Sequence, residues 1–230
     1  DRPHLIMAGE LLSGGKRMLL LPYGERWRTY RKIMHESLNT TAVAAYEPIQ
    51  MKEATLTAKD IGQDPGNFQR HFSRYAASTI MTITYDHPVR KLDDPLVVAV
   101  NERLHTFGKW TSMGASMLDK YPLLMWIPTP LNKWKKIGMR EHAKELDLFV
   151  STYRSVRERV QKNQAQTCFA SRLQEKQEKF GFTDADASYI CGESKTSRSL
   201  DLWRFSHSDL PQAPSSAPEV TLRQQRLVCW

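Results

Sequence analysis

The sequence predicts a mainly α-helical fold, and three observations support that class. Apolar residues recur three and four positions apart over several long segments, which is the spacing of one face of an α-helix. Alternating apolar and polar residues, typical of half-buried strands, are few. With 230 residues, 40% of them hydrophobic and 25% charged, the chain can bury a core of its own. We expect a helical domain over residues 1–193 and an unstructured tail over 194–230.

The first long helix is expected to begin just after Gly24 and to end near residues 39–41. Glu25 would lie in its first turn, where a carboxylate interacts favourably with the helix dipole. One face of this helix is marked by residues spaced four, three and four apart: Trp27, Arg31, Met34 and Leu38.

A second helix is expected from Phe68 to Tyr85, because Asp86, His87 and Pro88 form a stop signal after it. A stripe of mostly apolar residues runs along this helix, and such stripes usually face the core. The stripe consists of Phe68, Phe72, Tyr75, Ala76, Ile80 and Ile83.

Two more helices are expected further along the chain. One should cover Pro95 to Phe107, with proline at its first position, where a helix needs no N–H group. The other should be a long, charged helix from about residue 135 to 163. Its core-facing stripe consists of Leu146, Phe149, Val150, Tyr153, Val156 and Val160.

Residues 113–130 form an apolar segment that is interrupted by prolines. Pro122, Pro128 and Pro130 break a stretch that includes Trp126. Such a stretch is either a buried connector between helices or an exposed lid that contacts a membrane and admits an apolar substrate. The sequence leaves both interpretations open.

Residues 194–230 have a different composition from the rest of the chain. They are rich in Ser, Pro, Arg and Gln, and no helical or alternating pattern runs through them, which predicts disorder. Our hypothesis is that this tail arises from intron read-through, a frameshift or a truncated gene.

Trp27 and Arg31 are the candidate cofactor-binding residues. Four positions apart on a helix, they lie one turn above the other on the same face. Trp offers one indole N–H donor, and Arg offers a planar, permanently charged fork of donors. Such a pair can hold a carboxylate at the edge of an apolar molecule. The simpler alternative is that Trp27 is a core aromatic and Arg31 a solvated cation.

Composition argues against several other classes of function. The net charge of +8 is compatible with nucleic-acid binding, but most cations alternate with acids and no recognition motif is present, so we expect no nucleic-acid partner. Three irregularly spaced cysteines and unpaired histidines form neither a disulfide framework nor a metal site. No apolar run approaches the ~18 residues of a membrane span, and we expect no membrane anchor in this chain.

The segment from Pro22 to His35 closely resembles the C-helix of the cytochrome P-450 superfamily, the haem-thiolate monooxygenases, in particular the fungal microsomal branches. The resemblance runs from the B-helix to the start of helix I and covers roughly residues 1–193. Phe68 to Tyr85 resembles helix E, the segment at 113–128 resembles the F–G region, and 184–192 resembles the opening of helix I.

The resemblance implies a cofactor, an activity and partners. In this family the Trp and Arg of W-x-x-x-R bond a haem propionate, and here they match Trp27 and Arg31. A whole enzyme of this type would oxidise a hydrophobic small molecule with O2 and with electrons from an NADPH-dependent reductase, in fungal secondary metabolism. It would lie on the cytosolic face of the endoplasmic reticulum membrane, with peripheral contact through 113–130.

Departures from the family pattern are as informative as the matches. The oxygen-activation motif A-G-x-[DE]-T-T, expected shortly after Gly192, is absent, as are the K-helix E-x-x-R region and the F-x-x-G-x-x-x-C loop that supplies the iron ligand. We therefore assign no catalytic residue and no metal ligand, and we expect the chain as it stands to be inactive. The alternatives are a non-catalytic truncated pseudoenzyme and a basic helical interaction module.

Overall fold

In a computed structural model of the chain, residues 4–112 and 115–193 are described, and they form helices joined by turns, with no β-strand among them. The predicted mainly α class is confirmed. The helices are η1 (Ile6–Leu12), η2 (Met18–Leu20), α1 (Glu25–Leu38), α2 (Thr40–Ala44), α3 (Glu47–Gln63), η3 (Pro65–Asn67), α4 (Phe68–Tyr85), α5 (Pro95–Thr111), α6 (Met117–Lys120), η4 (Pro122–Trp126), α7 (Lys133–Gln161) and α8 (Phe169–Phe180). Residues 184–193 form a last helical segment. The tail predicted over 194–230 lies outside the described residues.

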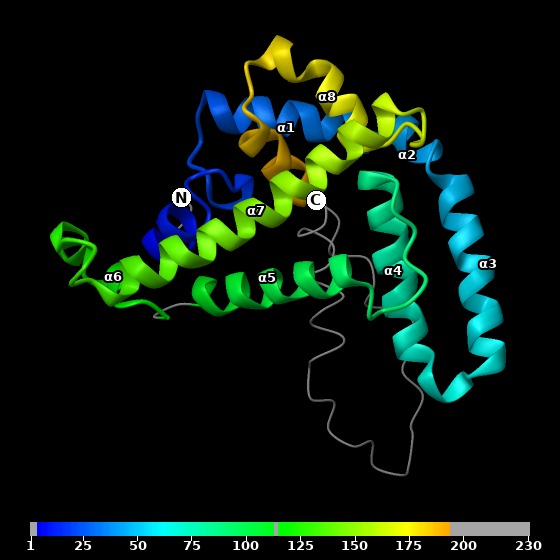
Figure 1. Cartoon of the computed structure of the whole chain (residues 1–230), viewed down its shortest axis with the longest axis horizontal. Coiled ribbons are helices and arrows are strands. Elements are labelled where there is room, and N and C mark those ends of the chain that lie inside the picture. The colour runs from blue at the N-terminus through cyan, green and yellow to red at the C-terminus, as the bar shows by residue number, and fades with distance from the viewer. Residues whose placement is uncertain (1–3, 113–114, 194–230) are drawn as a thin grey trace, which may run out of the picture.

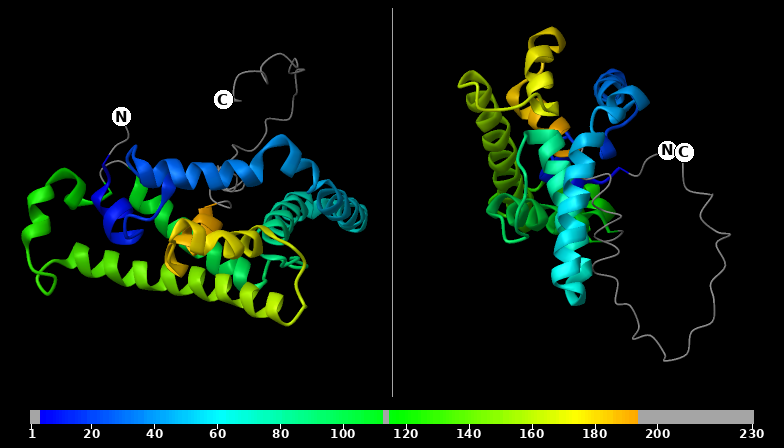
Figure 2. Two further views of the ribbon diagram at one scale, coloured as in Figure 1. Left: turned by 90° about the horizontal axis from the view of Figure 1, so that it is seen from above. Right: turned by 90° about the vertical axis from the view of Figure 1, so that its right-hand side faces the viewer.

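The long helix α7 spans most of the length of the molecule (Figure 1). Helices α3 and α4 lie side by side as an antiparallel pair at one end, and α6 lies at the other (Figure 1). Helix 184–193, coloured orange, lies between α1 and α7 in Figure 1 and in the left view of Figure 2. The segment that ends the described chain is therefore central to the fold.

The expected boundaries of the long helices are close to the observed ones. α1 begins directly after Gly24 and ends at Leu38. The helix expected to end at Phe107 continues to Thr111 as α5, and the Asp94 side chain accepts hydrogen bonds from the first backbone N–H groups of that helix. α7 begins two residues earlier than expected, because the Asn132 side chain caps it.

The stripe predicted to be buried on α4 is not the buried one. Phe68 and Phe72 are 49% and 53% exposed, and the rest of the predicted stripe is only partly buried. The face that is buried carries Arg74, Ser78, Met81 and Tyr85 instead. The physical reason is a polar contact with α3: the guanidinium of Arg74 donates to Glu53 and Thr57 in that helix, so a charged residue occupies the inner face.

Two clusters of buried side chains make up the core of the described residues. The larger joins α1, α4, α5, α7, α8 and helix 184–193, and includes Trp27, Tyr30 and Tyr153. The smaller joins η1, α5 and α6. η1 approaches α7 so closely that a Cβ atom on Gly138 would lie 2.6 Å from the Cβ of Leu11. No helix in the described part of the chain is both long and apolar enough to span a membrane.

The segment between α5 and α7 is partly packed and partly exposed. Leu124 and Met125 pack against the smaller core cluster, whereas Leu123 and Trp126 are 80% and 87% exposed. The Lys135 ammonium group of α7 donates to the carbonyl oxygen atoms of Met125 and Ile127 and holds the segment in place. The interpretation as a fully buried connector is therefore wrong for the two most exposed side chains. Residues 113–114, which belong to the same predicted segment, lie outside the described residues.

Candidate functional site

Trp27 and Arg31 lie together on α1. The guanidinium carbon of Arg31 is 5.2 Å from the centroid of the Trp27 ring, a distance typical of a cation–π contact. The Tyr23 ring packs edge-on against the indole, with ring centroids 4.6 Å apart. Trp27 is 8% exposed and belongs to the larger core cluster, whereas Arg31 is exposed. The pair therefore consists of a buried indole ring and a guanidinium at the surface that lies against it.

The charge of Arg31 is available to an anion. Within residues 4–112 and 115–193 no ion pair involves Arg31, whereas Arg26, five residues earlier on the same helix, binds the carboxylate of Asp186 at 2.6 Å. A guanidinium presents two parallel N–H donors to a carboxylate and is charged at any physiological pH. The donor set of this pair thus fits the propionate edge of a haem.

Iron ligation is a separate requirement, and the described cysteines do not meet it. Cys168 is 4% exposed and Cys191 is 0% exposed, and both are members of the larger core cluster. A haem ligand must present its sulfur to a cavity rather than pack it among side chains. Cys229 lies outside the described residues. The described part of the chain therefore fits the edge of the cofactor but not its iron.

Asp186 links the start of helix 184–193 to α1. One of its carboxylate oxygen atoms, Oδ2, accepts hydrogen bonds from the Thr183 hydroxyl at 2.6 Å and the Thr183 N–H at 3.2 Å, while the Thr183 hydroxyl accepts from the Asp186 N–H. This is a capping box. The other oxygen atom, Oδ1, accepts from Lys16 at 2.7 Å and Arg26 at 2.6 Å. Burial disfavours the charge, but the hydrogen bonds of Lys16 and Thr183 outweigh it and lower the pKa of Asp186 to about 2.

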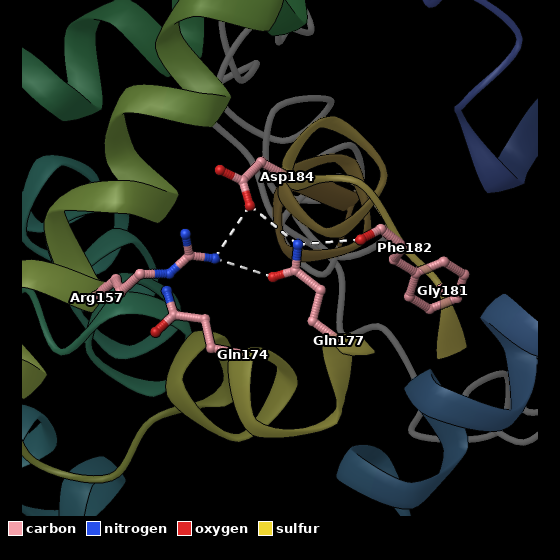
Figure 3. A pocket seen from close by; sticks show the side chains of 6 residues that line it. All are labelled: Arg157, Gln174, Gln177, Gly181, Phe182 and Asp184. Atoms are coloured by element: carbon pink, nitrogen blue, oxygen red, sulfur yellow. Dashed lines mark hydrogen bonds and ion pairs between the residues drawn. The ribbon is translucent and has the colours of Figure 1, made fainter. Parts of the chain in front are cut away.

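Asp184 plays a similar part on the other side of the same helix, beside a hollow of about 360 Å³ (Figure 3). The Gln177 amide donates to Asp184 at 2.9 Å and accepts from Arg157 at 3.0 Å, and Arg157 also donates to Asp184. The hydrogen bond from Gln177 and those from Arg154 and Arg157 lower the pKa of Asp184 to about 2. Arg157, Gln177 and Asp184 bind one another beside this hollow, and the residues that line it include neither Trp27 nor Arg31.

A buried charge cluster surrounds Arg17. Its side chain is 2% exposed, its guanidinium forms an ion pair with Glu145 of α7, and the guanidinium carbon lies 3.8 Å from the centroid of the Phe107 ring. Glu193 lies in the same cluster, where the Leu19 N–H donates to its carboxylate at 3.4 Å. Burial raises the pKa of Glu193 to about 7, against the opposing effect of Arg17.

Sequence reasoning identified the pair on α1 but missed these carboxylates. The pattern Thr183-x-x-Asp186 is a capping-box signal and could have located the start of the last helix. The Arg17 cluster has no such local signal, because Glu145 is 128 residues away in the sequence.

Comparison with known proteins agrees with the resemblance. The cytochrome P-450 family profile matches residues 7–194. A cytochrome P-450 monooxygenase of Armillaria gallica is 34% identical over 223 residues, which is 94% of this chain and 44% of the relative. Cytochrome P-450 monooxygenase 113 of Postia placenta is 36% identical over 193 residues, which is 84% of this chain and 38% of the relative. The chain spans less than half the length of these relatives. Its match to the family profile over most of its length, together with its helical fold, shows that the chain belongs to the cytochrome P-450 family.

Proposed function

We propose that α1 of this chain holds one propionate of a haem, with Arg31 binding the carboxylate and Trp27 packing beside it. The observation that carries the proposal is the 5.2 Å contact between the Arg31 guanidinium and the Trp27 ring, with no competing ion pair to Arg31 in the part of the chain that the structure describes. Each charge-assisted hydrogen bond of this kind contributes about 1.5–3 kcal/mol. When its iron also has a cysteine thiolate as axial ligand, haem supplies the O2 activation on which the monooxygenases of this family depend.

The whole protein to which this chain corresponds is proposed to be a monooxygenase. Its substrate would be a hydrophobic small molecule and its electron donor an NADPH-dependent reductase, on the cytosolic face of the endoplasmic reticulum membrane, as in the fungal members of the family. The 230 residues alone are proposed to be inactive, because Cys168 and Cys191 are packed in the core and none of the three cysteines lies in an F-x-x-G-x-x-x-C loop. A non-catalytic pseudoenzyme is the alternative.

A titration with two porphyrins tests the propionate site. The full chain is titrated with ferric haem and with its dimethyl ester, whose carboxyl groups carry no charge. The unmodified chain should bind haem at least about tenfold more tightly than the ester, because one charge-assisted bond is lost with the ester. Arg31→Met should remove this preference, and Arg28→Met, which changes an exposed cation on the same helix, should not. Equal affinity of the unmodified chain for both porphyrins would refute the proposal.

A spectrum tests the proposed inactivity. The reduced, haem-loaded chain is exposed to CO, and the position of the Soret band reports whether the iron has a thiolate ligand. We expect no thiolate-type shift. Observation of that shift would mean that one of the three cysteines ligates the iron, and the proposal that the chain lacks its own ligand would be wrong.

We also propose that residues 113–130 make peripheral membrane contact. The exposed Leu123 and Trp126 support this proposal, and the cation Lys120 lies beside them in the sequence. Co-sedimentation with vesicles that contain anionic lipid should fall severalfold in a Leu123→Ser/Trp126→Ser variant. Met51→Ser, which removes a side chain that is 60% exposed on α3, is the control. Equal vesicle binding by all three proteins would contradict the proposal.

The domain boundary is proposed to lie near residue 194, where the family profile ends. Two alignments with Armillaria gallica proteins cover 94% of the chain and therefore extend beyond residue 193, which argues against a tail that is wholly unrelated to the family. An origin of the tail in intron read-through or a frameshift is tested by sequencing the transcript and the DNA downstream. Absence of an A-G-x-[DE]-T-T segment and a cysteine loop from every downstream reading frame would refute that origin.

A further inference from the structure

The carboxylate of Asp186 joins three parts of the described chain at one point. Lys16 reaches it from the loop before α1, Arg26 reaches it from α1, and Thr183 binds it within its own helical segment. The Tyr30 hydroxyl, also on α1, lies 3.4 Å from the same oxygen atom, Oδ1. Two residues of α1 therefore meet the end of another helix at a single atom.

The position of these two residues on α1 relates them to the candidate site. Arg26 and Tyr30 are four apart and lie on one face, and Trp27 and Arg31 each follow one residue later. Successive residues of an α-helix are rotated by about 100° around its axis. The face of α1 that contacts Asp186 therefore lies about 100° around the helix axis from the face that carries Trp27 and Arg31. If α1 turned about its axis, both faces would turn together.

Asp186 is itself held rigidly. Its Oδ2 atom is occupied by the Thr183 hydroxyl and N–H, so its Oδ1 atom has a defined direction toward α1. The side chain is 14% exposed, which limits exchange of these contacts with water. Apolar packing of the buried face of α1 is non-directional, whereas hydrogen bonds to a fixed carboxylate depend on angle. Hydrogen bonds from Arg26 and Tyr30 to the fixed carboxylate of Asp186 can therefore set the rotation of α1 about its axis. Apolar packing alone keeps α1 against the core.

We propose that Asp186 is a positioning residue for the cofactor edge: it sets the rotation of α1 about its axis and so directs Trp27 and Arg31 toward the carboxylate of the porphyrin. This inference rests on the proposed propionate site and names a residue that acts on it from a different helix. Asp184 provides a matched control, because it lies in the same first turn but binds Arg154, Arg157 and Gln177 rather than α1.

The test uses the full chain and the same two porphyrins. Asp186→Asn should reduce the preference for haem over its dimethyl ester at least severalfold, toward the value of Arg31→Met, and Asp184→Asn should leave the preference unchanged. In chains labelled with 5-fluorotryptophan, the 19F resonance of Trp27, assigned with Trp27→Phe, should move in Asp186→Asn and stay in place in Asp184→Asn. This signal reports the surroundings of the indole without any porphyrin present.

A second variant tests the same contact in case Asp186→Asn disrupts the folding of helix 184–193. Arg26→Met removes the contact on the α1 side and leaves the capping box of Thr183 and Asp186 intact, so helix 184–193 keeps its start. It should lower the preference and move the Trp27 resonance as Asp186→Asn does. If Arg31→Met removes the preference while Asp186→Asn and Arg26→Met retain it, the positioning role is refuted and the propionate site stands. If the unmodified chain shows no preference, both are refuted.

Discussion

Replacement of Arg17 by methionine is expected to lower the free energy of unfolding of this chain by about 3–5 kcal/mol at pH 7, the range found when one partner of a buried ion pair is removed. Methionine keeps most of the aliphatic length of the side chain and can still pack on Phe107. The substitution therefore removes the charge and the donors more than it removes volume.

The contacts of Arg17 explain why the cost should reach that range. The guanidinium is 2% exposed and its partner carboxylate on Glu145 is 3% exposed, so water cannot replace either one. A second donor contact runs to the Ser13 hydroxyl at 3.2 Å, and the ring of Phe107 faces the cation at 3.8 Å. Without Arg17, two buried carboxyl groups, on Glu145 and Glu193, lose the cation that opposes their desolvation.

The free energy of unfolding should also depend on pH, and the pKa shifts of Glu145 and Glu193 give the sign of that dependence. Burial raises the pKa of Glu145 and raises that of Glu193 to about 7, so both bind protons more readily in the folded chain than in the unfolded one. Stability of the unmodified chain should therefore fall as pH rises from about 4.5, the ordinary value for Glu, through 7. In Arg17→Met this fall should be steeper, because loss of the cation raises the two pKa values further.

Urea unfolding, followed by circular dichroism at pH 6 and pH 7, measures these effects. Arg140→Met is the control, because that side chain is 66% exposed and its ion pair should contribute less than about 1 kcal/mol. At pH 6, where Glu193 is mostly protonated, the double variant Arg17→Met/Glu145→Leu should be more stable than Arg17→Met alone, since no charge is left buried. A loss for Arg17→Met no larger than that of the control, or a double variant that is worse than the single one, would refute the reasoning.

Four other substitutions probe packing, capping and acid stability. Gly192→Ala should destabilise the chain by about 1–3 kcal/mol in urea unfolding, because the new Cβ would lie 2.8 Å from a ring carbon of Phe149, whereas Gly108→Ala, in open space within α5, should stabilise it by about 0.5–1 kcal/mol. Asn132→Ala should cost about 1 kcal/mol by the same measurement, because its side chain accepts from two N–H groups at the start of α7; no loss would contradict its capping role. Asp184→Asn should lower the melting temperature at pH 7, and the difference from the unmodified chain should shrink to a small fraction as pH falls from about 4 to 2, since the low pKa of Asp184 makes its contribution depend on the ionised form. A difference at pH 2 that is as large as the one at pH 7 would show that the loss does not come from the charge of Asp184.

Features that depend on residues close together in the sequence could be predicted, and features that depend on residues far apart in the sequence could not. The start of α1 after Gly24 and the start of α5 after Asp94 are local, since capping residues and proline act within one turn. The contact between Trp27 and Arg31 is local in the same sense, because any α-helix brings residues four apart together. These parts of the fold and of the candidate site were predictable.

The failed prediction on α4 has the opposite cause. Periodicity selected the aromatic stripe that begins with Phe68 and Phe72, and it assumed that the most apolar face is the inner one. α3 instead offers Glu53, Thr57 and Asp60 to Arg74, so a guanidinium becomes buried with its partners. Which helix lies opposite is a tertiary fact, and it decides which face is buried. The same limit hid the cluster around Arg17.

Helix 184–193 connects these observations to the candidate site. Asp184 holds two cations of α7, Asp186 holds the loop and α1, and Glu193 lies beside Arg17, so the carboxylates of one short segment bind several cations of a chain whose net charge is +8. The contacts of Asp186 with Lys16, Arg26 and Tyr30, which are proposed to position α1, all lie within the described residues. The iron ligand has no such support there, because the described cysteines are packed in the core. The proposed propionate site therefore does not depend on an iron ligand, and it predicts that a porphyrin whose carboxylates are intact but which contains no iron still distinguishes Arg31→Met from the unmodified chain.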